Sequence, residues 1–346
     1  MSNPTTPDNI SDLTQRVSKL LHAGERMQAA DLIVQLKDKS RQTTDESSAN
    51  QVLATFRQWL LDEDRYEDCA ALLWPPSIFS AEPNSVRLMW SAIRESSQLM
   101  VMGAASVGKS FSCGVWLYLD WLRDPENTNV KVVGPSEDHL EKNLFSHLVN
   151  LHQTASVPSP GHCVRLGIVL DKHKRDAGIH GVVVPTGKKA PAKLQGIKVK
   201  SRPVTHPTLG DMTRVRIMLE EAEDIPVGIW EDVSNVLSNS DGIQQFKIFA
   251  AFNPKDQNGA CGVRCEPVGG WGHFDLESSF RWPSQRGWEV VRLDGYRVEN
   301  VLQDEKIFPG LQTKEGLKRV IMNAGGVNTR GYYTFARGAF PVDGAS

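Results

Sequence analysis

One octet restricts the fold of this chain more than any other stretch of the sequence. Residues 103–110 read GAASVGKS and match the phosphate-binding pattern G-x-x-x-x-G-K-[ST]. Such a loop leaves the carboxyl end of a buried strand and opens into a helix, because backbone N–H groups and the positive end of the helix dipole then converge on phosphate groups. Residues 98–102 are apolar enough to form the strand, and residues 111–122 fit the helix. The octet therefore predicts a nucleotide-binding α/β domain.

Bulk composition excludes several other classes of protein. The chain has 346 residues and a formal net charge of −2, so a contact with nucleic acid would have to be local. Its five cysteines are an odd number and widely spaced, which favours reduced thiols over a disulfide framework. Cys261 and Cys265 lie near His273 but lack a second ligand pair, so we expect loop cysteines and no zinc site. The sequence begins with no secretory signal and contains no membrane-spanning apolar run.

The pattern of apolar residues changes along the chain. Between residues 9 and 75 they recur at helical spacing, and the Pro- and Ser-rich residues 74–85 have no periodicity. We therefore expect an N-terminal helical subdomain over residues 1–78 and a P-loop domain over residues 79–346.

Six short apolar runs in the second part alternate with helical segments. This alternation implies crossover connections and predicts a doubly wound, mostly parallel sheet with helices on both faces. The predicted strands span residues 98–103, 130–134, 178–185, 215–219, 246–252 and 288–293.

Each position of the octet has an expected role. Lys109 would reach the β- and γ-phosphates of ATP, and the Ser110 hydroxyl would hold Mg²⁺. Backbone amides would cradle the phosphates along the loop, which consists of Gly103, Ala104, Ala105, Ser106, Val107, Gly108, Lys109 and Ser110.

Carboxylates and an amide follow two later strands. Glu220 and Glu221 end the run at 215–219, where one acid would complete the Mg²⁺ shell and the other would polarise the attacking water. We assign the metal to Glu220, although an aspartate is usual there, and the water to Glu221. A solvated acidic loop is the alternative, because Glu223 and Asp224 continue the charge. Asn253 ends the run at 246–252 and is a candidate sensor of the γ-phosphate.

These segments, in this order, resemble the ATPase domain of the large terminase subunit of tailed bacteriophages. The resemblance covers roughly residues 86–344 and rests on LEEAEDIPVGIWEDV (219–233), FAAFNPKD (249–256), WEVVRLDGYRVENV (288–301) and GYYTFARGAFPVDG (331–344). It implies an ATP-hydrolysing motor that uses Mg²⁺ and moves double-stranded DNA into a procapsid in the host cell cytoplasm, with no membrane. The implied partners are a portal protein, a small terminase subunit and further copies of the chain in a ring, a pentamer.

Two departures from the family modify these expectations. The octet contains no arginine, so an arginine finger would come from a neighbouring subunit, with Arg264, Arg281 and Arg286 as candidates. The family's nuclease domain would follow the segment at 331–344, but the sequence given ends at Ser346, so we expect no nuclease activity from it. Trp90 is a candidate for stacking on adenine.

The most basic stretch of the chain is a candidate DNA contact, because phosphate contacts are electrostatic and independent of sequence. A solvated loop is the alternative reading of the same residues. For the whole chain the alternatives are a helicase-like or other DNA-stimulated P-loop ATPase and a slow nucleotide-dependent regulatory module. The stretch contains Lys172, Lys174, Arg175, Lys188, Lys189, Lys193, Lys198, Lys200 and Arg202.

Overall fold

The computed structural model describes residues 46–157, 159–171, 173, 177–184, 197, 200–206, 208–237, 242 and 244–342, with isolated residues nearer the N-terminus. Most of residues 1–45, where the sequence predicts part of the helical subdomain, therefore lies outside the described residues. The chain divides into two compact units, Met1–Ala81 with Leu151–Ser159 and Glu82–Asn150 with Pro160–Ser346.

In the first unit, the described regular structure is helical. Helices α3 (Glu46–Leu60) and α4 (Tyr66–Leu73) are joined by the short 3-10 turn η1 (Glu63–Arg65). The indole N–H of the buried Trp74 donates to Leu151 O at 2.9 Å, which ties the later segment of this unit to the end of α4.

The second unit is built on a nine-stranded sheet, in the order β10-β11-β1-β9-β8-β2-β5-β4-β3. The six strands from β11 to β5 are parallel, and β10, β4 and β3 add antiparallel edges. Strands β6 (Ser201–His206) and β7 (Gly210–Met212) form a separate pair. The nine strands are β1 (Gln98–Gly103), β2 (Thr128–Gly134), β3 (His162–Val164), β4 (Gly167–Val169), β5 (Gly178–Val183), β8 (Arg214–Glu220), β9 (Phe246–Phe252), β10 (Arg281–Pro283) and β11 (Glu289–Leu293).

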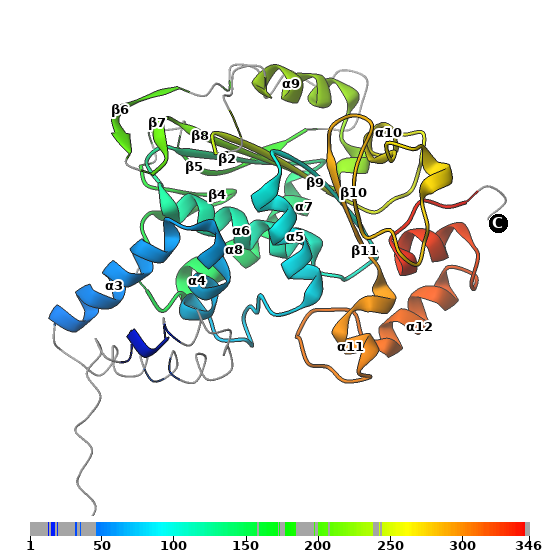
Figure 1. Cartoon of the computed structure of the whole chain (residues 1–346), viewed down its shortest axis with the longest axis horizontal. Coiled ribbons are helices and arrows are strands. Elements are labelled where there is room, and N and C mark those ends of the chain that lie inside the picture. The colour runs from blue at the N-terminus through cyan, green and yellow to red at the C-terminus, as the bar shows by residue number, and fades with distance from the viewer. Residues whose placement is uncertain are drawn as a thin grey trace, which may run out of the picture. The chain divides into compact units, whose positions relative to one another are not determined.

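Helices lie on both sides of this sheet, with α9 and α10 on one side and α5 and α6 on the other (Figure 1). The two sides bury alternate residues of the strands, as the period of two requires. Met100 and Met102 of β1 share a core with Trp230 of α9, whereas Phe249 of β9 meets Trp116 of α6 with ring centroids 5.5 Å apart. The helices are α5 (Asn84–Glu95), α6 (Lys109–Arg123), α7 (Glu137–Leu140), α8 (Ser146–Thr154), α9 (Val227–Leu237), α10 (Ala260–Cys265), α11 (Glu299–Leu302) and α12 (Lys314–Asn323).

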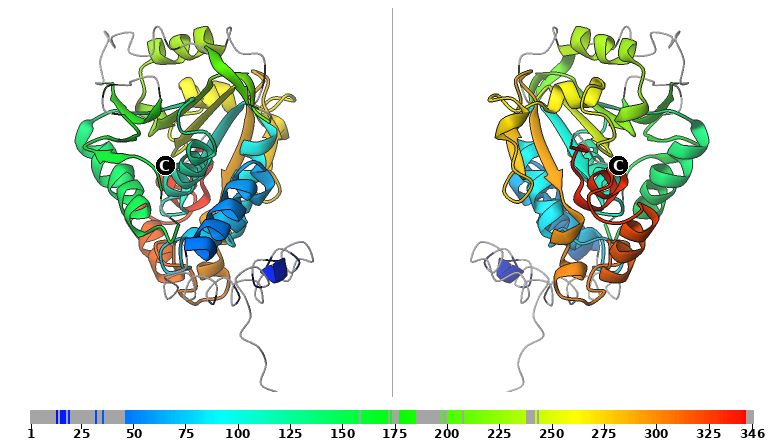
Figure 2. Two further views of the ribbon diagram at one scale, coloured as in Figure 1. Left: turned by 90° about the vertical axis from the view of Figure 1, so that its left-hand side faces the viewer. Right: turned by 90° about the vertical axis from the view of Figure 1, so that its right-hand side faces the viewer.

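Shorter helical turns connect these elements. Two of them are π-helical, and Figure 2 shows the C-terminal one beside the sheet in red. They are η2 (Glu141–Phe145), η3 (Ala222–Asp224), η4 (Trp271–His273), η5 (Gly295–Arg297) and η6 (Tyr332–Arg337).

A buried ion cluster fixes α6 against β8. The Asp120 carboxylate of α6 pairs with two arginines of β8, Arg214 and Arg216. The Nε atom of Arg216 lies 2.7 Å from that carboxylate, and all three side chains are fully buried. Although burial opposes the charged form of Asp120, the two guanidinium groups hold the pKa of its carboxyl well below the usual range. Because α6 begins at Lys109, this cluster also sets where the start of α6 lies relative to the end of β8.

The predicted fold class is confirmed: the sheet is mostly parallel and covered on both faces. The six predicted strands correspond to β1, β2, β5, β8, β9 and β11. Strands β3, β4, β7 and β10 have only three residues each, and β6 is polar, so no apolar run marks them in the sequence. None of the described helices is long and apolar enough to cross a membrane.

Candidate functional site

Three strand ends line up at the carboxyl edge of the sheet. Strand β9 lies between β1 and β8, with Met102 opposite Phe252 and Glu220 opposite Ala251. The loop that begins at Gly103, Asn253 and Glu221 therefore all leave the sheet at the same edge, where ligands bind in open α/β sheets.

The predicted phosphate loop runs from β1 into α6. Ser106 and Gly108 adopt left-handed backbone conformations, with φ of +55° and +83°, which curl the loop. The amides of Ala104 and Ala105 donate to Leu293 O and Phe335 O, both at 2.9 Å, so these two N–H groups point away from a ligand in the curl. In the described part of the chain, the amides of Ser106, Val107 and Gly108 have no hydrogen-bond acceptor. The cradle of free amides is therefore shorter than the octet suggests.

Lys109 directly follows the curled loop and is the first residue of α6. Its ammonium group donates to Gly103 O at 3.1 Å, Ala104 O at 2.8 Å and Asn253 Oδ1 at 3.0 Å. Burial lowers the pKa of Lys109 to about 8, although the nearby Glu220 carboxylate acts in the opposite direction. A half-buried cation at the start of a helix is suited to holding a polyphosphate.

Ser110 and Glu220 meet across the gap between α6 and β8. The Ser110 hydroxyl donates to Glu220 Oε1 at 2.5 Å, and Glu220 is only 4% exposed. The other carboxylate oxygen of Glu220 is buried and has no hydrogen-bond partner in the described part of the chain. A hydroxyl and a carboxylate with a spare oxygen fit a hard cation such as Mg²⁺, whose shell phosphate oxygens and water would complete. Within the described ranges, no group of three His, Cys, Asp or Glu side chains is placed to hold a metal alone.

Glu221 stands on a strained turn. Its backbone φ is +48°, a left-handed conformation that is rare outside glycine and often found at functional sites. Its side chain is 37% exposed, and Glu221 Oε1 lies 3.4 Å from His139 Nε2. The turn therefore presents a solvent-accessible carboxylate beside His139, which also lies near Glu220, as a residue that polarises water requires.

His139 is a site residue that the sequence did not reveal. It comes from α7, which follows β2, and β2 pairs with β8 so that Val133 faces Leu219. His139 Nε2 is 3.9 Å from Glu220 Oε1, and the carboxylates of Glu220 and then Glu221 raise the pKa of the imidazole against the effect of burial. The sequence points to His139 only through its position. It follows the strand predicted at 130–134, and the neighbouring strand in the sheet is the one that ends in Glu220.

Asn253 links the P-loop lysine to the turn after Glu221. Its side chain accepts from Lys109, and its backbone N–H donates to Glu223 Oε1 at 3.3 Å. Burial raises the pKa of Glu223, and Lys255 Nζ lies 3.2 Å from the same carboxylate oxygen. The end of β9 is thereby connected both to Lys109 of the P-loop and to the turn that follows Glu221.

Two predicted contacts are wrong. Trp90 is fully buried between α5 and α6 and donates its indole N–H to Ser112 O, so it has no face for adenine to stack on. Arg202 is 8% exposed and lies 2.8 Å from the Asp124 carboxylate, so it is not part of an exposed DNA-binding surface. Lys200 is exposed. The other basic residues of that stretch lie outside the described residues: Lys172, Lys174, Arg175, Lys188, Lys189, Lys193 and Lys198.

The arginine candidates and the cysteines are also placed. Arg281 pairs with Glu95 and Glu289 of its own chain, and Arg264 stacks on Trp230 at 4.3 Å. Arg286 is exposed and makes no hydrogen bond or ion pair to the described part of the chain. All five cysteines are free, and those of α10 belong to the apolar core.

No family model and no curated protein matches the sequence. Solved structures that resemble the chain include the large terminase ATPase domain of Thermus phage P74-26, with 16% identity, a TM-score of 0.46 and coverage of 72% of this chain and 92% of that one. A second is the large terminase of a thermophilic bacteriophage in complex with ADP, with 12% identity, a TM-score of 0.43 and coverage of 73% and 51%, so this chain spans about half its length. A mutant of the P74-26 domain has 15% identity, a TM-score of 0.40 and coverage of 60% and 80%. Likeness at these identities bears on the fold alone.

Proposed function

We propose that this chain hydrolyses ATP at the carboxyl edge of its sheet and is the motor domain that moves double-stranded DNA into a viral procapsid. One observation carries the ATPase assignment: side chains from the ends of β8 and β9, from α7 and from the P-loop helix converge there, with Lys109 on Asn253, Ser110 on Glu220, and Glu221 on His139. A solvated acidic loop would not need a half-buried lysine beside a carboxylate oxygen that has no partner among the described residues.

The residues divide the chemistry between them. Lys109 and the amides of Ser106 to Gly108 hold the β- and γ-phosphates, and Glu221 accepts a hydrogen bond from the attacking water and polarises it. Ser110 and Glu220 would hold Mg²⁺, which would neutralise charge on the phosphates. Asn253 exchanges its contact with Lys109 for one with the γ-phosphate, so hydrolysis changes what the tip of β9 contacts.

The motor assignment rests on the family resemblance of residues 86–344. It brings with it a ring of copies of this chain, a portal protein, a small terminase subunit and the host cytoplasm as the site of action. An arginine from a neighbouring copy would complete each site, and Arg286 is the candidate without an intramolecular partner in the described residues.

ATP turnover with and without double-stranded DNA tests the proposal. We expect DNA-stimulated phosphate release that Lys109→Ala removes, and DNA uptake when empty capsids and partner subunits are added. Absence of turnover under both conditions would contradict the ATPase, and stimulation by single-stranded DNA with strand separation would indicate a helicase.

A slow regulatory module is the second candidate, and Glu220 favours it. The usual aspartate is shorter by one methylene, and here the longer side chain reaches Ser110 directly, at 2.5 Å. Tight nucleotide binding with turnover that DNA does not accelerate would support this alternative.

A further inference from the structure

The stretch FARGAF (335–340) has no role in the proposed chemistry, but its backbone contacts the first residues of the P-loop. Ala105 donates its N–H to Phe335 O. A Cβ added at Gly338 would lie 2.4 Å from Ala104 N and 2.7 Å from Gly103 Cα, and the φ of Gly338 is +57°. Only a glycine permits this close approach of two backbones.

Arg337 anchors the turn that makes these contacts. Its Nε lies 3.0 Å from Asp294 Oδ2 and its Nη2 lies 2.7 Å from Glu277 Oε1, while Arg292 donates to its carbonyl oxygen at 2.7 Å. Arg337 is 8% exposed, and its guanidinium lies over the ring of Tyr296 at 5.3 Å. Asp294 directly follows Leu293, the acceptor for Ala104 N–H, so one charged cluster fixes the acceptors of both loop amides.

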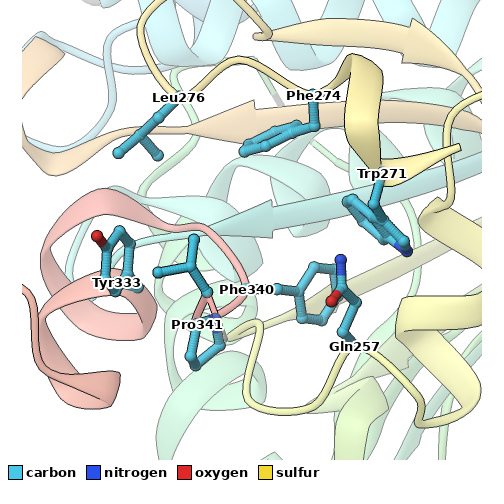
Figure 3. Close-up of a pocket in the computed structure, with 8 residues that line it drawn as sticks. Gln257, Trp271, Phe274, Leu276, Tyr333, Phe340 and Pro341 are labelled. Atoms are coloured by element: carbon cyan, nitrogen blue, oxygen red, sulfur yellow. The ribbon is translucent and has the colours of Figure 1, made fainter. Parts of the chain in front are cut away.

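Apolar packing and ion pairs hold different parts of this stretch. Phe340, which follows the turn, is buried in the apolar core with its ring 5.3 Å from that of Trp271, and both residues line a cavity of about 250 Å³, seen in Figure 3. At the turn itself, the directed ion pairs of the buried Arg337 fix the backbone.

We propose that Arg337 is a positioning residue of the nucleotide site, which holds the turn at Phe335–Gly338 against the P-loop and so orients the free amides of Ser106 to Gly108. The inference rests on the proposed function. Loop amides contact the phosphates in the ground state and in the transition state alike, so Arg337 sets nucleotide affinity and not the rate of the chemical step.

The test compares Arg337→Gln with Arg319→Gln, a matched change at an exposed arginine of α12 that pairs with Glu315. Calorimetry with ADP measures Kd, and steady-state ATP turnover separates KM from kcat. For Arg337→Gln we expect a rise of about tenfold or more in both Kd and KM, with kcat changed by less than about threefold. Arg319→Gln should match the unaltered protein, and Arg337→Lys should fall between them because it keeps the charge and loses the fork. A purely structural role would lower the folded fraction, and with it kcat, at unchanged KM.

Gly338→Ala is the second variant, because it pushes on Ala104 without removing a charge. It should raise Kd for ADP by at least as much as Arg337→Gln, and thermal denaturation shows whether each variant is folded. Should both fail to fold, Arg337→Lys decides alone. A wild-type Kd in the folded variants, or a loss confined to kcat, overturns the inference. If the unaltered protein does not bind ADP, the proposed function fails together with it.

Discussion

Different kinds of contact hold the two sides of the P-loop, which we call its front and its back. The front consists of Lys109 and Ser110 with their partners Asn253 and Glu220, and it is held by side-chain hydrogen bonds. The back is held by backbone contacts, in which Ala104 and Ala105 donate to carbonyl oxygens of β11 and η6. Side chains at the front can change partners when a ligand arrives, whereas the backbone contacts at the back fix where the loop lies.

This difference separates two kinds of effect on activity. Removal of the water-polarising carboxylate of Glu221, or of its partner His139, should alter the chemical step. Loss of the charge on Lys109 and displacement of the loop from the back should both alter binding, because the lysine and the loop amides hold the phosphates already in the ground state. The following tests examine that separation, which fails if changes at Glu221 or His139 raise Kd as changes at the back do.

Glu221→Gln should have the largest effect. The amide keeps the shape of the side chain but cannot polarise water as a carboxylate does, so kcat should fall by about 10²–10⁴-fold. Kd for ADP should stay within about threefold, because Glu221 is not a phosphate ligand. Phosphate release at saturating ATP measures the first and calorimetry the second. Activity close to that of the unaltered protein would remove Glu221 from the mechanism.

His139→Ala should have the next largest effect. His139 is the one side-chain partner of Glu221 within the described residues, so its loss frees the carboxylate to rotate and should lower kcat by about 10–100-fold. His139→Gln places an amide near the position of Nε2 and should recover most of the rate. Equal losses in both variants would mean that the imidazole does something other than orient Glu221.

Alkaline pH should weaken nucleotide binding through Lys109. Its pKa of about 8 means that the ammonium form predominates at pH 7 and is the minor form at pH 9. Bound phosphates favour that charged form, so binding takes up a proton above the pKa, and Kd for ADP should rise about tenfold between pH 7 and pH 9. Lys109→Arg is the control: its guanidinium stays charged, so its Kd should remain flat over the same interval. A Kd of the unaltered protein that is independent of pH would contradict the lowered pKa.

The sequence predicts the front of the loop well and the back poorly, for a physical reason. Lys109, Glu220 and Asn253 each follow a recognisable apolar strand, and parallel strands bring their carboxyl ends to one edge. His139 lies five residues beyond the end of β2, so no strand pattern marks it. Arg202 belongs to a basic run that the sequence alone suggests is solvated, and only the folded chain shows its ion pair with Asp124. Backbone carbonyls such as Phe335 O have no residue-type signal at all, so a contact made through them appears only when the chain is folded.

The smallest predicted effect comes from a side chain that connects the back to the front by a hydrogen bond. Thr334 of η6 is buried, and its hydroxyl donates to Pro254 O at 2.9 Å, next to Asn253. Thr334→Val keeps the shape and leaves that carbonyl without its partner, so the free energy of unfolding should fall by about 1 kcal/mol, measured by urea denaturation. If the two sides are independent, KM and kcat should each change by less than about threefold, because the P-loop keeps its contact with Phe335 O and Lys109 keeps Asn253. A change of tenfold or more in kcat at near-normal stability would show instead that η6 acts on the β9 tip, and the front and the back would have to be treated as one mechanical element.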